Sequence, residues 1–153
     1  MADFTPPPPN DGSPFADMRA HHVAVRTPEF ETAKRWYVEK LDFRIIVEWD
    51  FADMRLAYLA PAADDHFYVE IIGGGEPGPR DVRPYTDLID SLKYTGYHHF
   101  CLTVTNIERT VENLRARDVK VVTEPFDLPA IGRRLAFFCD PFGNLIELAE
   151  VLP

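Results

Sequence analysis

Residues His21–Val25 of this chain read HHVAV and residues His98–Leu102 read HHFCL, so a doubled histidine opens two apolar stretches. Each stretch has a counterpart further on, because residues Tyr68–Ile72 read YVEII and residues Leu145–Leu148 read LIEL. The second histidines and the two glutamates are each 77 residues apart, and 48 residues separate histidine from glutamate in both halves. We therefore interpret the ordered chain as two copies of one structural unit.

Each copy shows the pattern of a strand, a helix and three further strands. Residues Ala20–Arg26 alternate as a strand does, and Thr27–Glu29 then supplies a cap and a proline for a helix. In the second copy, Thr105–Glu108 has the form of a capping box. Apolar residues follow at helical spacing: Phe30, Ala33, Tyr37 and Leu41, then Ile107, Val111 and Leu114. The remaining strands are expected at 43–49, 54–59 and 66–72, and at 120–123, 134–139 and 144–151.

The rest of the chain is expected to carry little regular structure. Residues 1–17 hold four consecutive prolines, which favour a disordered or loosely docked tail. We place a single domain at 18–153, made of a module at 18–73 and a module at 96–153. The linker at 74–95 is rich in glycine and proline, with one helical turn expected near Thr86–Leu92.

Composition excludes several classes of partner. The chain has 153 residues and a net charge of −9, which argues against nucleic acid and anionic membranes because both attract a positive surface. There is no apolar run of the roughly 18 residues that a membrane-spanning helix needs, and no secretory signal. Cys101 and Cys139 are expected to be buried free thiols, so we expect a cytoplasmic protein.

Strand periodicity selects one histidine of each doubled pair. Residues two apart in a strand face the same way, so His22 lies with Ala24 and Arg26, opposite the bulky valines. The same phase places His99 away from its apolar neighbours. An acid within an apolar strand must also face away from the core or be neutralised, which applies to Glu70 and Glu147.

These four side chains form a candidate metal-binding set. A lone histidine or glutamate in a strand is more often a hydrogen-bonded or solvated residue, but the duplication favours ligands. Imidazole and carboxylate groups suit a divalent iron, manganese, cobalt, nickel or zinc ion. Four protein ligands leave two positions of a six-coordinate metal for neighbouring oxygens of a small-molecule substrate. His66 has no counterpart and is expected at the surface, while Trp36, Tyr37, Phe137 and Phe138 are expected in the core.

The repeated unit, together with the closing sequence DPFGNLIEL at Asp140–Leu148, resembles the vicinal oxygen chelate superfamily. That superfamily includes glyoxalase I, methylmalonyl-CoA epimerase, extradiol dioxygenases and the fosfomycin and bleomycin resistance proteins. The resemblance implies an α+β fold with two tandem βαβββ modules, forming a cupped mixed sheet of eight strands around a metal. It also implies a homodimer, because a dimer completes the cup in many members.

The family's four ligand positions fall on His22, Glu70, His99 and Glu147, as in bacterial glyoxalase I. The resemblance therefore implies a metal-dependent lyase or isomerase, in which Glu147 or Glu70 acts as the base. Arg26 stands where some glyoxalases hold a substrate carboxylate. The alternatives are an epimerase, an iron or manganese dioxygenase, and a non-catalytic protein that binds a small molecule.

Overall fold

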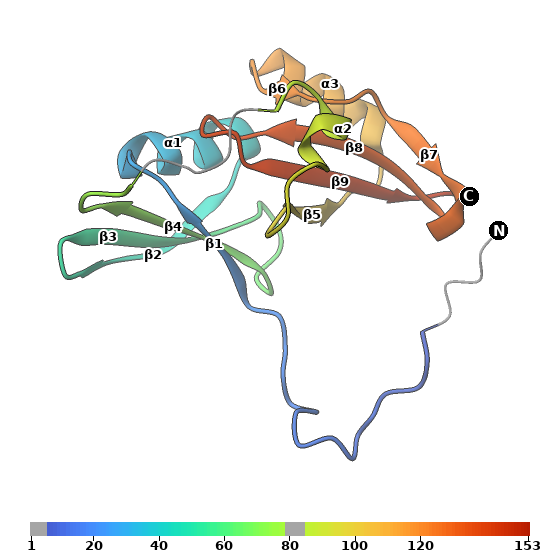
Figure 1. Ribbon diagram of the computed structural model, residues 1–153, viewed down its shortest axis with the longest axis horizontal. Helices are drawn as coiled ribbons and strands as arrows, with labels where there is room; N and C mark the ends of the chain where they lie inside the picture. Colours follow the sequence, from blue (N-terminus) through green and yellow to red (C-terminus); the bar gives the residue numbers. More distant parts are fainter. Residues whose placement is uncertain (1–5, 79–84) are drawn as a thin grey trace.

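The computed structural model describes residues 6–78 and 85–153, and Figure 1 shows two sheets side by side with helices packed on them. In chain order, the elements of the first module and the linker are β1 (His22–Arg26), α1 (Phe30–Leu41), β2 (Arg44–Phe51), β3 (Met54–Ala60), β4 (Tyr68–Gly74) and α2 (Leu88–Ser91). Those of the second module are β5 (His99–Thr103), α3 (Ile107–Ala116), β6 (Lys120–Val121), β7 (Phe126–Leu128), the 3₁₀ turn η1 (Pro129–Ile131), β8 (Arg133–Cys139) and β9 (Leu145–Val151).

The two sheets repeat one topology, which confirms the α+β fold and the duplication of its unit. Sheet A has the strand order β1-β4-β3-β2, and sheet B has the order β5-β9-β8-β6 with β7 also paired to β8. The first strand of each sheet pairs in parallel with the last, while the other pairs are antiparallel. The expected continuous sheet of eight strands is not formed within the described chain, because β1 and β5 are the edges of two separate sheets.

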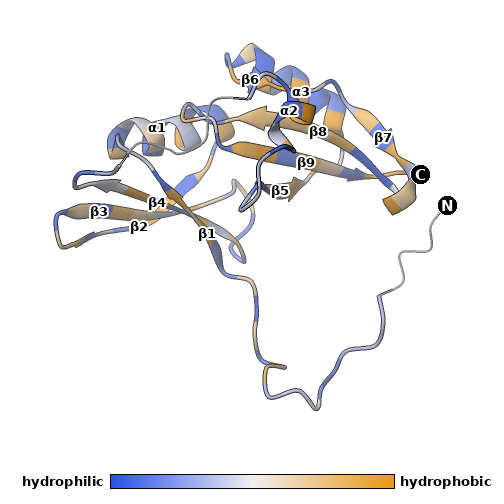
Figure 2. Cartoon of the chain, viewed as in Figure 1, coloured by the Kyte–Doolittle hydropathy of each residue, from blue (hydrophilic) through white to orange (hydrophobic). Residues whose placement is uncertain are grey.

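The helices lie where the spacing of apolar residues predicts them. The residues that cap their N-termini, however, are not the ones that the sequence predicted. The side chain of Asn106, rather than that of Thr105, caps α3 by accepting from Arg109 N over 2.8 Å. Before α1, Thr27 Oγ1 accepts from Glu29 N over 3.2 Å, so Thr27 shapes the entry and the helix begins at Phe30. Figure 2 shows hydrophilic and hydrophobic residues interleaved along both helices, as expected for helices with one buried face.

One hydrophobic core joins the two modules. Tyr37 of α1, Ile107 of α3 and Phe138 of β8 belong to the same buried cluster, together with the inward-facing residues of β1, β3 and β4. Trp36 is partly buried against this cluster, whereas Phe137 lies in a second cluster on the other face of sheet B. That second cluster packs against Tyr85 and Leu88, so the linker covers part of this face (Figure 1).

The sequence DPFGN forms the turn between β8 and β9. Asp140 is 4% exposed, and its carboxylate accepts from Phe142 N, Asn144 N and Asn144 Nδ2 over 2.7–2.9 Å. Gly143 has a φ of 79°, which a residue with a Cβ adopts only with strain. The turn therefore explains much of this motif in structural terms, and it sets the register of the strand that carries Glu147.

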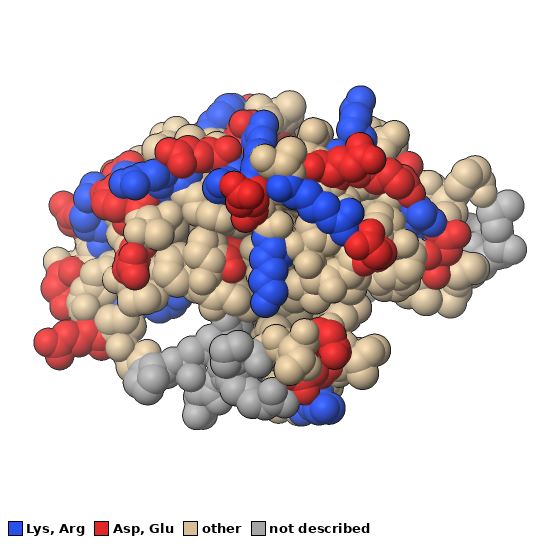
Figure 3. All heavy atoms as spheres, turned by 90° about the horizontal axis from the view of Figure 1, so that it is seen from above, with Lys and Arg blue, Asp and Glu red and all other residues tan. Residues whose placement is uncertain are grey.

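The remaining surface carries mixed charge. Basic and acidic side chains are interspersed on the face seen in Figure 3, without a large field of one sign. In Figure 1 the N-terminal residues from Pro6 onward run away from both sheets, while the first five residues of the expected tail and residues 79–84 of the linker lie outside the described parts. Among the described helices, none has the length and apolar character needed to cross a membrane.

Candidate metal centre

The first module brings His22 and Glu70 together. Glu70 of β4 lies opposite Ala24 of β1, so its side chain shares the face of His22 two residues earlier. His22 Nε2 is 3.4 Å from Glu70 Oε2, and the glutamate side chain is only 11% exposed. Val25, one residue out of phase, is buried in the core. His22 and Glu70 therefore face away from the core, as the alternation along the strands predicts. The pair lies on the face of sheet A that the helices leave open.

The second module repeats this pair with His99 and Glu147. Glu147 of β9 lies opposite Cys101 of β5, and His99 is two residues before that cysteine. His99 Nε2 is 2.9 Å from Glu147 Oε2, with the histidine side chain 30% and the glutamate side chain 14% exposed. Each module thus presents one ring nitrogen and one carboxylate oxygen to the same point, which we call a half-site.

The two half-sites do not meet within one chain. In residues 6–78 and 85–153, no group of three or more histidine, cysteine or acidic side chains is close enough to hold one metal ion. The expected convergence of four ligands is therefore wrong for a single chain. Both histidines stand on edge strands, β1 and β5, whose outer sides are open to another strand within the described structure.

The donor atoms of each half-site fit a divalent first-row metal. Imidazole nitrogen and carboxylate oxygen are ordinary ligands of such ions, and each half-site holds both types within 3.4 Å of each other. A carboxylate this far removed from water needs a cationic or hydrogen-bonding partner. The two half-sites together would offer two neutral and two anionic ligands, which balance the charge of a divalent ion.

Two aromatic rings that the sequence did not assign to the site pack against its histidines. The Tyr58 ring lies 5.2 Å from the His22 ring, and the Phe137 ring lies 5.4 Å from the His99 ring at 89°. Tyr58 is the cross-strand neighbour of Glu70, and Phe137 is that of Glu147. The strand register is the signal that would have found both, because each aromatic residue faces its glutamate from the preceding strand.

Cys101 differs from the sequence-based expectation. Its side chain is exposed on the open face, in phase with His99, whereas Cys139 is buried as expected; neither cysteine forms a disulfide. Partial burial and the adjacent Glu147 carboxylate, to which the thiol is hydrogen-bonded, raise the pKa of Cys101 to about 12. The thiol is therefore a protonated donor to Glu147 at neutral pH.

Arg26 makes backbone contacts in this structure. Its guanidinium donates to Thr27 O over 2.8 Å, to Ile72 O over 3.1 Å, and to Gly74 O. These bonds fasten the end of β1 to the end of β4, four residues along β1 from His22. The expected role in substrate binding stays a prediction. His66 is exposed, in line with its expected place at the surface.

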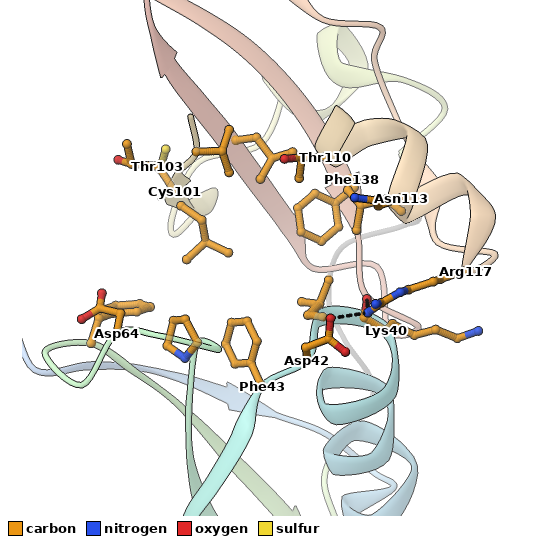
Figure 4. Close-up of a pocket in the computed structure, with 17 residues that line it drawn as sticks. Lys40, Asp42, Phe43, Asp64, Cys101, Thr103, Thr110, Asn113, Arg117 and Phe138 are labelled. Carbon is orange, nitrogen blue, oxygen red and sulfur yellow. Dashed lines mark hydrogen bonds and ion pairs between the residues drawn. The ribbon is translucent and has the colours of Figure 1, made fainter. Parts of the chain in front are cut away.

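A pocket of about 500 Å³ lies where the two modules meet (Figure 4). Phe43 and Phe67 of the first module face Leu102 and Phe138 of the second across it. Cys101, which touches Glu147, is also in the lining, so the pocket reaches the edge of the second half-site.

Comparison with known proteins places this fold in a family. The description "Glyoxalase/Bleomycin resistance protein/Dioxygenase superfamily" matches residues 19–148, and the chain belongs to that superfamily. A Bacillus subtilis relative of uncharacterised function, YwkD, is 30% identical over 132 residues, which span 85% of this chain and 94% of the relative. The bovine mitochondrial methylmalonyl-CoA epimerase is 23% identical over 86% of this chain and 74% of its own. A probable chloroplastic lactoylglutathione lyase of Arabidopsis thaliana is 26% identical over 86% of this chain, but over only 35% of the longer relative.

Solved structures share the fold at low sequence identity. The protein SMU.1112c superposes with a TM-score of 0.68 at 24% identity, over 87% of this chain and 98% of the other. A glyoxalase I mutant from Zea mays reaches a TM-score of 0.66 at 21% identity, over 88% of this chain and 46% of the other. At such identities the similarity establishes the architecture.

Proposed function

We propose that this protein is a metal-dependent enzyme of the glyoxalase type, a lyase or isomerase that moves a proton on a carbon next to a carbonyl group. The observation that carries the proposal is the duplicated half-site, with ring nitrogen and carboxylate oxygen 3.4 and 2.9 Å apart on equivalent strands. The relatives named lactoylglutathione lyase and methylmalonyl-CoA epimerase support a reaction at such a carbon.

We further propose that the active form is a homodimer in which the half-sites come from different chains. His22 and His99 stand on open edge strands, so a twofold dimer can set β1 of one chain beside β5 of its partner. This arrangement would join the sheets into one cup, with β7 as an additional strand beside the expected eight. Each of the two resulting sites would then have His22 and Glu70 from one chain with the partner's His99 and Glu147.

The residues of the chain have separate tasks in this reaction. A bound divalent ion such as Ni²⁺, Zn²⁺, Mn²⁺, Fe²⁺ or Co²⁺ would polarise the substrate carbonyl. The proton on the neighbouring carbon would then be more acidic and easier to remove. His22 and His99 would hold the ion, while Glu147 or Glu70 takes the proton from one carbon and returns it to the adjacent carbon, as the hydroxyl proton passes to the former carbonyl oxygen. Tyr58 and Phe137 limit rotation of the two histidine rings. Cys101 and Cys139 do not form a disulfide, which supports a reducing compartment such as the cytoplasm.

The test is the metal content and turnover of purified protein. We expect wild-type protein to contain a first-row divalent metal and to convert methylglyoxal in the presence of glutathione. The variant Glu147→Gln keeps the shape of the side chain but removes the base, so turnover should fall by roughly 10²-fold or more.

The matched control is Glu124→Gln, since that side chain is 77% exposed and pairs with Arg115 at the surface. This variant should keep full metal content and turnover. Wild-type turnover in Glu147→Gln would contradict the role of Glu147. Metal without any glutathione-dependent turnover would favour an epimerase, and substrate-dependent oxygen uptake would favour a dioxygenase.

A further inference from the structure

The first histidine of each doubled pair lies against the ring of the second. His21 Nδ1 is 2.8 Å from His22 Nδ1, and His98 Nδ1 is 2.7 Å from His99 Nδ1. The rings cross at 84° and 81° in the two modules. Because the same geometry occurs in two separate sheets, it follows from the repeated sequence rather than from one local environment. A contact of this length between two ring nitrogens requires a proton on one of them.

In the second module this contact continues to α2 in the linker. Ser91 Oγ is 2.8 Å from His98 Nε2 and 2.6 Å from Leu88 O. Ser91 is fully buried, and the N-cap bond from Asp90 N to Asp87 Oδ1 over 2.8 Å holds the turn in place. The linker therefore anchors a chain of polar contacts that ends at the half-site.

With both imidazole rings neutral, the donors and acceptors in this chain have one consistent assignment. A carbonyl oxygen carries no proton, so the single hydroxyl proton of Ser91 lies toward Leu88 O. Ser91 Oγ then accepts from the Nε2–H of His98. A neutral imidazole has one N–H, so His98 Nδ1 is an acceptor, and His99 must donate its Nδ1–H to it.

This assignment leaves the Nε2 lone pair of His99 pointing at Glu147 Oε2, 2.9 Å away. Two electron-rich atoms at that distance repel each other, so a proton or a metal ion that both atoms can bind would stabilise the pair. The ring is thus held with its metal-binding nitrogen toward the carboxylate and its other nitrogen committed to His98. Hydrogen bonds of this kind fix both the tautomer and the orientation of a histidine ligand.

We propose that His98, anchored by Ser91, is a positioning residue that fixes His99 in the tautomer and orientation required for metal binding. His21 does the same for His22, with its ring held by Tyr58 and Tyr68 at centroid distances of 5.5 and 5.1 Å. The inference rests on the proposed metal-dependent function, and it assigns roles to histidines outside the expected ligand set. The serine anchor makes the second half-site the more rigid of the two.

The test is the affinity of the purified full-length protein for Co²⁺, with the visible spectrum of the bound ion as a second readout. His98→Leu removes the acceptor, so we expect affinity to fall about 10–100-fold and the spectrum to change. Ser91→Ala should have a smaller effect, and His21→Leu a smaller effect than His98→Leu. His98→Gln should recover part of the loss, since its amide oxygen can accept from His99 and its amide NH₂ can donate to Ser91.

His66→Leu is the matched control, because His66 is exposed and outside this chain of contacts, and its affinity should stay at the wild-type value. Long-range proton–nitrogen NMR of the Zn²⁺-loaded protein should find the proton of His98 on Nε2 and that of His99 on Nδ1. Wild-type affinity in both His98→Leu and Ser91→Ala, or a proton on His98 Nδ1, would overturn the inference while the proposed function stands. Failure of the wild-type protein to bind Co²⁺ or Zn²⁺ would overturn the proposed function itself.

Discussion

Tyr37 lies in the centre of the core shared by the two modules, with no exposed surface, and its hydroxyl donates to Asp140 Oδ2 over 3.5 Å. Burial raises the pKa of the Tyr37 phenol well above its ordinary value of 10, and the nearby Asp140 carboxylate raises it further. The unfolded chain therefore loses this proton at a lower pH than the folded protein does.

Alkaline pH should accordingly destabilise the protein through Tyr37. The contribution of this group to folding is fully present below about pH 10 and is lost as the pH rises toward the folded-state pKa. We expect urea unfolding of wild-type protein to show a free energy that falls as the pH rises above about 10, and the fall should be smaller for Tyr37→Phe. Tyr68→Phe is the control, since its hydroxyl donates to Asp65 O over 2.8 Å at the surface, and it should change this pH dependence less. An equal slope in wild type and Tyr37→Phe would contradict the assignment.

At the scale of the element, the turn between β8 and β9 depends on one buried carboxylate. Asp140 accepts three hydrogen bonds from within the turn, so Asp140→Ala should leave their donors unsatisfied. We expect a loss of about 2–3 kcal/mol in the free energy of unfolding, measured by urea denaturation. Asp65→Ala is the control, because this side chain is 71% exposed in its pair with Arg44 and should cost less than about 1 kcal/mol. Equal costs for the two variants would contradict a structural role for Asp140.

The elements that the sequence predicted well are those with a long periodic pattern. The span of α1 and the cores of β1, β3, β8 and β9 follow from spacing, because each has a buried face in a single chain. β7 was missed because its three residues are too few to show alternation. The choice of Thr105 as a cap was wrong because the adjacent Asn106 is an equally good capping residue, and only the backbone path distinguishes them.

The residues of the candidate site were also predicted only in part. Duplication and strand phase selected His22, Glu70, His99 and Glu147, and the structure brings these residues together in pairs. Tyr58, Phe137 and Ser91 could not be found in this way, since their places depend on strand register and on the path of the linker. Convergence of all four ligands could not be decided from one sequence either, because it depends on which edges of the two sheets meet.

At the scale of the whole molecule, the two half-sites of one chain lie apart. We therefore predict that an altered half-site can regain metal binding only through an arrangement of two chains. In the proposed dimer, each site takes one half-site from each subunit. A chain with His22→Gln and Glu70→Gln keeps an intact second half-site, and a chain with His99→Gln and Glu147→Gln keeps an intact first half-site. Neither homodimer should then hold a complete set of four ligands.

Mixing the two variants gives the decisive outcome. A heterodimer purified through two different affinity tags would combine both intact half-sites in one of its two sites and both altered half-sites in the other. We expect it to bind about half as much metal per dimer as wild type and to recover about half of the turnover, because a twofold dimer has two equivalent interfaces between edges. If each site were formed within one chain, every site of the heterodimer would be incomplete and its metal content would match that of the inactive homodimers. Elemental analysis of the three purified dimers therefore distinguishes a shared site from an internal one, because the two arrangements place the same four substitutions in different sites.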